Sequence, residues 1–406
     1  PPPPPPPPPH TTHTHPRAPH PLMIYDVLIV GSGALGTFHA YHAARRGLKV
    51  AVLEKNGAPK DATVRNFGQV VPSGMDSEWQ LIGRRSLEIY RDIQSQFDIS
   101  ASQNGSIYLA SDQDEFTLLE ELAAINETTG YRSELWTPEK CRQQYPNLRH
   151  DYCVGGLFFP EEISVNPRLM INRLHQFRRD RDDVTFHYRH LASGIRENAN
   201  GIITIACTNG ENFQAEKAII CSGSEFQFLY PDLFAQSEIE LVKLQMLRLR
   251  PQLSGVLSGN ILTGLSIRRY ESFAACPSYQ RIIAARPGDS FATKWGIHIL
   301  FKQERDGGII LGDSHEYAPA SRPDELDFDL RETINQFFIS ESKRIMTLSS
   351  WDIESAWYGL YCQTKEPGGI FLRSPAENIH IATGIGGKGM TGSAGFAEKN
   401  INTLIL

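Results

Sequence analysis

Short apolar runs alternate with a helical pattern near the beginning of the chain. Residues 25–30 (YDVLIV) are mostly apolar, which predicts a buried parallel strand. A helical pattern then continues through Arg46 and ends at Gly47, a residue suited to a helix C-cap. Residues 49–53 (KVAVL) predict a second buried strand. The order strand, helix, strand therefore predicts a parallel α/β unit.

A glycine-rich turn joins the first of these strands to the helix. Gly31, Gly33 and Gly36 have the spacing GxGxxG, which allows a sharp turn, a close approach of the backbone to a pyrophosphate, and tight packing of helix on strand. The amides at the helix N-terminus would face the phosphates. Glu54 ends the second strand, where an acid would accept hydrogen bonds from a ribose hydroxyl and disfavour a 2′-phosphate. This context predicts a dinucleotide site and argues against NADP.

Three later segments extend the prediction of a dinucleotide site. Residues 65–69 (RNFGQ) form a polar loop, and residues 218–224 (AIICSGS) form an apolar strand that ends in a turn of small residues. Residues 379–391 (IHIATGIGGKGMT) run from a strand through a glycine-rich turn into a helix. In this order, the three segments resemble the flavin-contacting elements of the D-amino-acid-oxidase-like (DAO) flavoenzymes. The resemblance implies an FAD-dependent oxidoreductase.

The resemblance also implies a set of cofactor contacts. The residues expected to contact FAD are Gly31, Gly33, Ala34, Leu35, Gly36, Glu54, Lys55, Arg65, Asn66, Phe67, Gly68, Gln69, Ser222, Gly223, Gly384, Gly386, Gly387, Gly389, Met390 and Thr391. A sarcosine-oxidase branch attaches its flavin through a cysteine, but residues 359–361 take that place here and Cys362 is offset. Non-covalent FAD is therefore expected, with covalent attachment as the alternative.

The resemblance to the DAO flavoenzymes also predicts the fold and its division into domains. We expect an α/β fold in which a Rossmann-type FAD-binding domain, formed by residues 23–98, 150–225 and 350–406, is interleaved with an α+β substrate domain. The substrate domain would comprise residues 99–149 and 226–349 and use a mostly antiparallel sheet. The segments with β-type patterns are 106–110, 157–159, 261–273, 295–303 and 308–312, with a hairpin turn at 306–308 and helices over 77–97 and 332–348.

Four short segments resemble the DAO branch found with phosphonate-catabolism enzymes. They are residues 243–248 (KLQMLR), 269–273 (RYESF), 296–298 (GIH) and 312–317 (GDSHEY). The likeness implies a small amine substrate, namely 2-aminoethylphosphonate or an N-methyl derivative. Two alternatives remain: an amino-acid, sarcosine or glycine-type oxidase with a carboxylate substrate, and a non-catalytic FAD-binding subunit of a hetero-oligomeric dehydrogenase.

Anion recognition calls for a bidentate guanidinium, helped by tyrosine, histidine or lysine donors. If residues 265–273 form a strand, Arg268 and Tyr270 share one face, whereas Arg269 shares the other with Phe273. The branch likeness favours Arg269 and Tyr270, although the usual place of a single arginine is the solvated surface. The full set of candidates for binding the substrate is Arg248, Arg268, Arg269, Tyr270, His298 and Lys302.

Lys388 and His298 are the candidate catalytic residues. Lys388 lies in the C-terminal glycine-rich turn, where it would place a fixed positive charge beside the flavin or else point to solvent. His298 lies within an apolar run and could instead be a core histidine. The cofactor accepts hydride from the carbon next to nitrogen, and the imine hydrolyses, so no nucleophile motif is needed. The electron acceptor is oxygen or an unidentified partner.

Composition bears on the class of protein, on the state of its cysteines and on its location. With 40 Lys and Arg, 46 Asp and Glu, and a net charge of −6, the chain does not have the basic character of a nucleic-acid-binding protein. The six cysteines form no CxxC pair, so reduced thiols, a cytoplasmic location and no metal site are expected. No run of about eighteen apolar residues suggests a membrane span. Residues 1–22, rich in proline and histidine, are expected to be a disordered leader or a tag. A homodimer is compatible with these observations.

Overall fold

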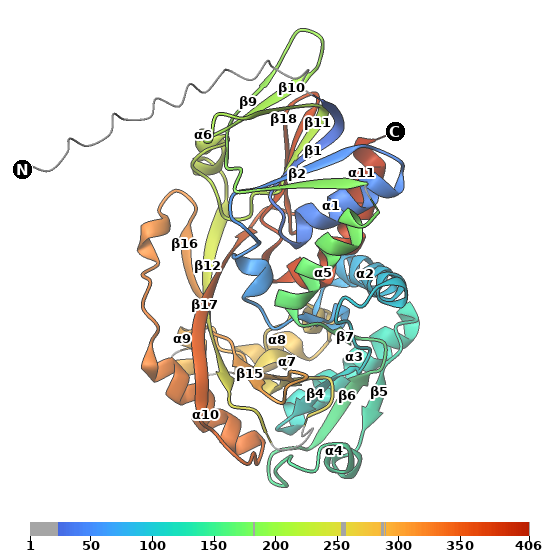
Figure 1. The fold of residues 1–406 in the computed structure, drawn as a ribbon. Helices are drawn as coiled ribbons and strands as arrows, with labels where there is room; N and C mark the ends of the chain where they lie inside the picture. Colours follow the sequence, from blue (N-terminus) through green and yellow to red (C-terminus); the bar gives the residue numbers. More distant parts are fainter. Residues whose placement is uncertain (1–22, 182, 253–256, 286–287, 289, 406) are drawn as a thin grey trace, which may run out of the picture.

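The computed structural model describes residues 23–181, 183–252, 257–285, 288 and 290–405, which are built around two large sheets (Figure 1). The expected leader, residues 1–22, lies outside the described residues. The first sheet contains eight strands, and its main path has the order β18-β19-β11-β1-β2-β8. Its strands are β1 (Ile24–Val30), β2 (Val50–Glu54), β8 (Val184–Tyr188), β9 (Ala192–Glu197), β10 (Ile203–Cys207), β11 (Asn212–Ile220), β18 (Phe371–Ala376) and β19 (Ile379–Thr383).

The centre of this sheet is parallel, as the two apolar runs predict. β1 pairs in parallel with β2 and with β11, and β2 pairs in parallel with β8. All five residues of β2 are buried, which explains why its sequence is almost continuously apolar. Helix α1 (Ala34–Arg45) packs on this sheet together with α5 (Pro167–Arg179), α11 (Gly389–Leu404) and, beyond α11, α2 (Ser77–Gln96). This arrangement is the predicted Rossmann-type unit.

The second sheet has nine strands and is mostly antiparallel. Its path has the order β16-β12-β15-β14-β13-β4-β6-β5, and β17 pairs with β12. Only β13 and β4 are parallel neighbours. Its strands are β4 (Ser106–Ala110), β5 (Glu134–Trp136), β6 (Gly155–Phe159), β12 (Ile239–Leu249), β13 (Asn260–Thr263), β14 (Leu300–Gln303), β15 (Ile309–Gly312), β16 (Glu316–Pro319) and β17 (Ile353–Thr364).

Short elements connect and cover the two sheets. A small two-stranded sheet consists of β3 (Gln69–Val70) and β7 (Ile163–Ser164). The other helices are α3 (Gln113–Thr129), α4 (Pro138–Gln144), α6 (Pro231–Ala235), α7 (Gly264–Ile267), α8 (Tyr279–Ala284), α9 (Phe291–Lys294) and α10 (Glu332–Ile345), and the 3₁₀ turns are η1 (Ala62–Val64), η2 (Pro72–Gly74), η3 (Glu271–Ala275), η4 (Pro323–Glu325) and η5 (Gly386–Lys388). Across the described part of the chain, none of these helices has the length and apolar character that a bilayer crossing requires.

The pattern-based prediction of a strand over residues 261–273 is wrong beyond Thr263. The chain instead enters α7, and the amide of Tyr270 donates to the carbonyl of Ser266, four residues earlier. Because these amides form helical hydrogen bonds, no strand ladder is available to them, and the expected sharing of faces between Arg268 and Tyr270 does not apply. The predicted strand over residues 295–303 likewise begins only at Leu300, which leaves His298 in the preceding loop.

The strand pairing also departs from the predicted domain segments. β6 and β17 belong to residue ranges that were assigned to the FAD-binding domain, yet they pair with β4 and β5 and with β12 in the second sheet. β17 runs alongside β12 over almost the full length of both strands (Figure 1). The sequence pattern marks these strands but does not reveal which sheet they join, because pairing depends on distant partners.

Candidate active site

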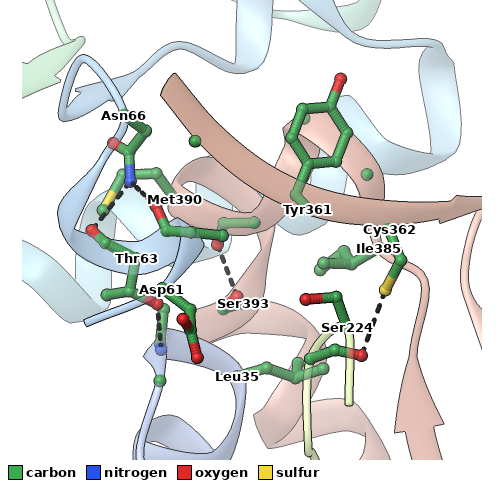
Figure 2. A pocket seen from close by; sticks show the side chains of 18 of the residues that line it. Leu35, Asp61, Thr63, Asn66, Ser224, Tyr361, Cys362, Ile385, Met390 and Ser393 are labelled. Atoms are coloured by element: carbon green, nitrogen blue, oxygen red, sulfur yellow. Dashed lines mark hydrogen bonds between the residues drawn. The ribbon is translucent and has the colours of Figure 1, made fainter. Parts of the chain in front are cut away.

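A cavity of about 550 Å³ extends from the glycine-rich turn after β1 to the second sheet. It is lined by the loop of residues 65–69, the C-terminal turn of residues 384–391, part of β17 and the loops that flank β14 and β15. Figure 2 shows Thr63 and Asn66 on one side of this cavity and Cys362 and Ile385 on the other. Its size is typical of a small-molecule or cofactor site. Elements far apart in sequence therefore meet around one space.

At the end of the cavity next to β1, two glycines stand where a side chain would collide with the backbone. Gly31 has a φ of +100°, and a Cβ there would lie 2.3 Å from the carbonyl oxygen of Cys221. A Cβ on Gly36 would lie 2.0 Å from the carbonyl oxygen of Gly31. Gly36 does not line the cavity, so its contribution is the close packing of α1 on the turn. Gly33 precedes α1 and makes no side-chain cap, while Oγ1 of Thr63 accepts from the amide of Ala34 at 2.9 Å. The positive end of the α1 dipole therefore faces the cavity beside the Thr63 hydroxyl, an arrangement that suits an anion.

Glu54 is held beside this turn at the end of β2. Its side chain is buried and accepts hydrogen bonds from the amide and the hydroxyl of Ser32, at 3.2 and 2.7 Å, and from the amide of Asn56 at 2.8 Å. A carboxylate has lone pairs for further donors, such as ribose hydroxyls. The glycine cradle, the start of α1 and this buried acid together fit the adenosine and pyrophosphate portions of a dinucleotide.

The loop of residues 65–69 is fixed by its own hydrogen bonds. The side-chain oxygen of Asn66 accepts from the amide of Gly68 at 2.7 Å, and its side-chain nitrogen donates to the carbonyls of Ala62 and Thr63. Gly68 has a φ of +74°, and a Cβ there would lie 2.2 Å from the carbonyl oxygen of Val165. The loop is therefore a rigid wall of the cavity.

The C-terminal turn closes the cavity against this loop. Gly384 and Gly386 both have positive φ values, and α11 begins at Gly389 without a side-chain cap. The hydroxyl of Thr391 accepts from the amide of Val71 at 3.0 Å, which ties α11 to the segment after the loop. The start of α11, which directly follows η5, and the loop of residues 65–69 line the same part of the cavity, where the positive end of the helix dipole would face a bound flavin ring.

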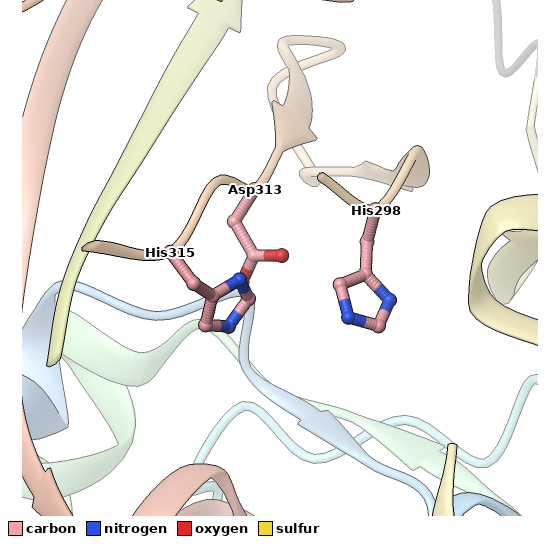
Figure 3. Close-up of side chains that lie close together, drawn as sticks. All are labelled: His298, Asp313 and His315. Atoms are coloured by element: carbon pink, nitrogen blue, oxygen red, sulfur yellow. The ribbon is translucent and has the colours of Figure 1, made fainter. Parts of the chain in front are cut away.

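The other end of the cavity is polar. His298, Asp313 and His315 place their side-chain nitrogen and oxygen atoms within 4.8 Å of one another (Figure 3). They come from two loops whose main chains pair, since the amide of His298 donates to the carbonyl of Asp313 at 2.8 Å. Nδ1 of His298 lies 3.2 Å from Oγ of Ser266, and Nδ1 of His315 lies 2.8 Å from the carbonyl oxygen of Gly296. A side-chain hydroxyl and a backbone carbonyl therefore orient the two histidine rings.

Burial changes the protonation of this cluster. Desolvation raises the pKa of Asp313 to about 7, an effect that Arg269 partly opposes. Desolvation, helped by Arg269, lowers the pKa of His315 to about 3, so its imidazole is neutral at physiological pH. Oδ1 of Asp313 is buried and has no hydrogen-bond partner among the described residues. A titratable carboxyl therefore faces this end of the cavity near neutral pH.

Arg269 and Tyr270 line the cavity beside this cluster, from the turn after α7. Arg269 donates to the carbonyl of Gly296 and, at 2.7 Å, to the hydroxyl of Tyr317. A Cβ on Gly296 would lie 2.6 Å from Nη1 of Arg269, so that glycine makes room for the guanidinium. The ring of Tyr270 packs 5.0 Å from that of His298, and burial raises the pKa of Tyr270. The guanidinium is thus held in one position.

Lys388 lies in η5 and lines the cavity, but it is neither a free cation nor a solvent-directed side chain. Its ammonium forms an ion pair with Glu271 at 2.9 Å, and its side chain is 17% exposed. The same ammonium lies 5.8 Å from the centroid of Trp79. The pair links the C-terminal turn to η3.

Three other candidate cations do not line the cavity and instead form ion pairs or hydrogen bonds within the protein. Arg248, expected to bind the substrate, lies outside the cavity lining and pairs with Asp306 at 2.8 Å and with Glu354, so the structure does not bring it to the site. The remaining two cations are also satisfied: Arg268 pairs with Asp112 and Glu115, and Lys302 donates to the carbonyls of Phe67 and Val165 and to Glu304. A cationic residue in a strand pattern gives no indication of which partner it will meet.

The remaining sequence candidates do line the cavity. Every residue expected to contact FAD lies on its surface except Gly36, and so do Lys388, His298, Arg269 and Tyr270. Asp313, His315, Tyr317 and Tyr361 also line it, although the sequence analysis did not select them. The segment 312–317 (GDSHEY) carried a signal, because it places an acid, a histidine and a tyrosine on alternate positions after a strand.

The six cysteines are free and buried, as expected for reduced thiols. Cys362 lines the cavity, and its sulfur lies 3.3 Å from the carbonyl oxygen of Gly223 and 3.4 Å from the hydroxyl of Thr383. Burial raises the pKa of this thiol above its usual value. A thiol that stays protonated is a poor nucleophile.

The family model described as DAO, FAD dependent oxidoreductase, matches residues 26–399. The chain therefore belongs to the DAO family of FAD-dependent oxidoreductases, which confirms FAD as the predicted cofactor.

Individual relatives match shorter stretches. The mitochondrial sarcosine dehydrogenase of Mus musculus is 27% identical over 148 residues, which are 35% of this chain and 16% of that protein. The glycine oxidase of Bacillus licheniformis is 25% identical over 211 residues, which are 49% of this chain and 54% of that protein. The chain thus spans about half or less of the length of these curated relatives.

One solved structure confirms the predicted fold class. The crystal structure of glycine oxidase from Geobacillus kaustophilus matches this fold with a TM-score of 0.72 at 16% sequence identity, and the match covers 94% of each chain.

Proposed function

We propose that this protein catalyses the FAD-dependent oxidation of a carbon–nitrogen bond in a small amine that also carries an anionic group. The observation that supports this most strongly is the single cavity, which joins the dinucleotide cradle at Gly31 to a polar end bearing Arg269 and Asp313. When bound there, FAD would supply the acceptor for the hydride from the carbon next to nitrogen. The released imine would hydrolyse in water to a carbonyl compound and an amine.

The chain itself would bind and orient the two reactants. Arg269, already fixed by Gly296 and Tyr317, would bind the anionic group of the substrate, and Tyr270 would pack against its carbon chain. The ion pair between Lys388 and Glu271 would hold the C-terminal turn against the second sheet, which excludes water from the space between them.

For the substrate we propose a phosphonate, 2-aminoethylphosphonate or an N-methyl derivative. The likeness of residues 269–273 and 312–317 to the phosphonate-associated branch favours it, and both segments border the cavity. A carboxylate substrate is the second candidate, because the names of the relatives concern sarcosine and glycine. An arginine fork accepts either anion, so the guanidinium alone does not decide between them.

The visible spectrum of the flavoprotein, recorded anaerobically during titration, tests the proposal. The titrants are N-methyl-2-aminoethylphosphonate, 2-aminoethylphosphonate, sarcosine and glycine. Bleaching by the phosphonates alone is the expected result. Bleaching by sarcosine or glycine alone would replace the phosphonate by a carboxylate substrate. Bound FAD that no amine bleaches would contradict the proposed activity and favour a non-catalytic FAD-binding subunit.

We also propose that FAD is bound non-covalently, since the Cys362 thiol is buried and engaged with Gly223 and Thr383. Precipitation of the protein with acid should leave all of the yellow colour in the supernatant. Colour retained in the pellet would contradict this and assign Cys362 as an attachment point.

A further inference from the structure

From the polar end of the cavity we infer that Asp313 binds the ammonium group of the substrate and accepts a proton from it, while Arg269 binds the anionic group. The substrate class is then a zwitterionic amine whose two charged ends are read by two fixed side chains. This inference rests on the proposed function, because it assigns the amine end of the substrate of that same site.

The surroundings of Asp313 call for a donor that the protein does not supply. Its Oδ1 is buried and unpartnered among the described residues, although the residue lines the cavity. A buried carboxylate oxygen without a donor is destabilised relative to a hydrogen-bonded one. Figure 3 shows the carboxylate of Asp313 between the rings of His298 and His315. A cationic N–H group entering from the cavity would satisfy it.

The charges near Asp313 favour a zwitterion over a simple anion. Arg269 is the cation that acts most strongly on Asp313, and the neutral His315 adds no charge. Arg269 and an ionised Asp313 therefore balance one another. A zwitterion preserves this balance, whereas an anion without an amine would leave one uncompensated negative charge in a buried space. The ionisable groups that face Asp313 from the surrounding elements are Arg269, Tyr270, His298, His315, Tyr317 and Tyr361.

The proton transfer itself is simple. One N–H bond of the ammonium breaks, its electron pair stays on nitrogen, and an O–H bond forms on the carboxylate of Asp313. The amine then has the neutral form from which a hydride can leave the adjacent carbon. A carboxyl group whose pKa is raised toward neutrality is suited to receive and release this proton.

A metal ion is the competing occupant of the same cluster, because two histidines and one aspartate are within reach of a common centre. Arg269 argues against it. The guanidinium acts on both Asp313 and His315, and a divalent cation placed between them would be repelled by it. A singly charged ammonium that donates hydrogen bonds is less strongly opposed.

Isothermal titration calorimetry on the FAD-loaded protein tests the inference without turnover. The probes are (2-amino-2-methylpropyl)phosphonate and 2-aminoisobutyrate, whose carbon next to nitrogen carries no hydrogen and so cannot be oxidised. Each is compared with the isostere in which a methyl group replaces the amine, (2,2-dimethylpropyl)phosphonate or pivalate. At least one amine should bind about tenfold or more tightly than its isostere.

Proton release gives a second readout in the same experiment. When the titration is repeated in buffers of different ionisation enthalpy, binding of the amine should release about one proton at pH 6, where free Asp313 is mostly protonated, and almost none at pH 8.5. Asp313→Asn should remove both the proton release and the preference for the amine. Asp306→Asn is the matched control, because that exposed carboxylate pairs with Arg248 away from the cavity, and it should change neither.

Several outcomes would overturn the inference. They are an absence of binding, equal affinity for amine and isostere in the unmodified protein, proton release that persists in Asp313→Asn, and one equivalent of a transition metal that is lost in that variant. The comparison of ligands needs no variant, so it stands even if Asp313→Asn does not fold. Failure of the proposed function has a different signature, since FAD would then remain unbleached by every amine.

Discussion

The two ends of the cavity are built in different ways. The dinucleotide end consists mainly of backbone: glycines that no side chain could replace, and the starts of α1 and α11. The amine end consists of side chains from loops that meet only in the folded chain, with Arg269 from the turn after α7 and Asp313 from the loop after β15. A backbone site tolerates few substitutions, and it binds the pyrophosphate that dinucleotides share. A side-chain site can change its substrate through single substitutions.

The largest expected effect concerns the backbone end. Gly31→Val should abolish FAD binding, because a Cβ at this position would lie 2.3 Å from the carbonyl of Cys221 and φ is +100°. The ratio of flavin to protein absorbance in the purified variant measures the loss. Gly194→Ala is the control, since the nearest described atom to a Cβ there is the Cβ of Ala206 at 3.9 Å, an ordinary contact, and it should keep its FAD. Full occupancy in Gly31→Val would show that the turn does not form the cradle.

The next largest expected effect concerns the pH dependence of kcat/KM, which depends on Asp313 at the amine end. Burial raises the pKa of Asp313 to about 7, so the ionised carboxylate that we expect to bind the ammonium is lost as the pH falls below that value. The kcat/KM for the amine should therefore fall by roughly tenfold per pH unit between about pH 7 and pH 5. Asp313→Asn should lack this limb of the profile. An unchanged limb in that variant would assign the titration to another group.

Removing the anion-binding group should have a comparable or smaller effect. Arg269→Met should raise the KM for the amine by about tenfold to a hundredfold, because charge-assisted hydrogen bonds contribute roughly 1.5–3 kcal/mol each. Arg248→Met is a matched control, since Arg248 is likewise held by two partners, Asp306 and Glu354, but lies off the cavity lining. Steady-state kinetics on both variants make the comparison. Equal KM values would show that Arg269 does not bind the substrate.

The smallest expected effect lies where the two ends meet. Lys388→Met removes the pair with Glu271, which is half-exposed and therefore screened by solvent. Reoxidation of the reduced flavoprotein should slow by about twofold to tenfold, the range expected for one partly solvated charge. Lys399→Met, which breaks an exposed pair with Glu78, is the control. An unchanged rate in Lys388→Met would remove that lysine from the reaction.

These two ends also mark the limit of prediction from sequence. The spacing of Gly31, Gly33 and Gly36 identifies the cradle, because the backbone requirements there are local and leave a fixed pattern. The strand over residues 261–273 was mispredicted because local hydrophobicity did not reveal that hydrogen bonds of the helical type would follow Gly264. Asp313 and His315 were not selected because their significance depends on burial and on Arg269, which lies over forty residues away in sequence. Long-range contacts of this kind carry no local signature.

The central claim is that one cavity holds FAD and a zwitterionic amine together. A crystal structure of the protein with FAD and (2-amino-2-methylpropyl)phosphonate tests it most directly. The flavin ring should lie between residues 65–69 and residues 386–390, with the ammonium bonded to Asp313 and the phosphonate to Arg269. FAD bound outside the cavity, or the amine bound with its ammonium away from Asp313, would contradict the account.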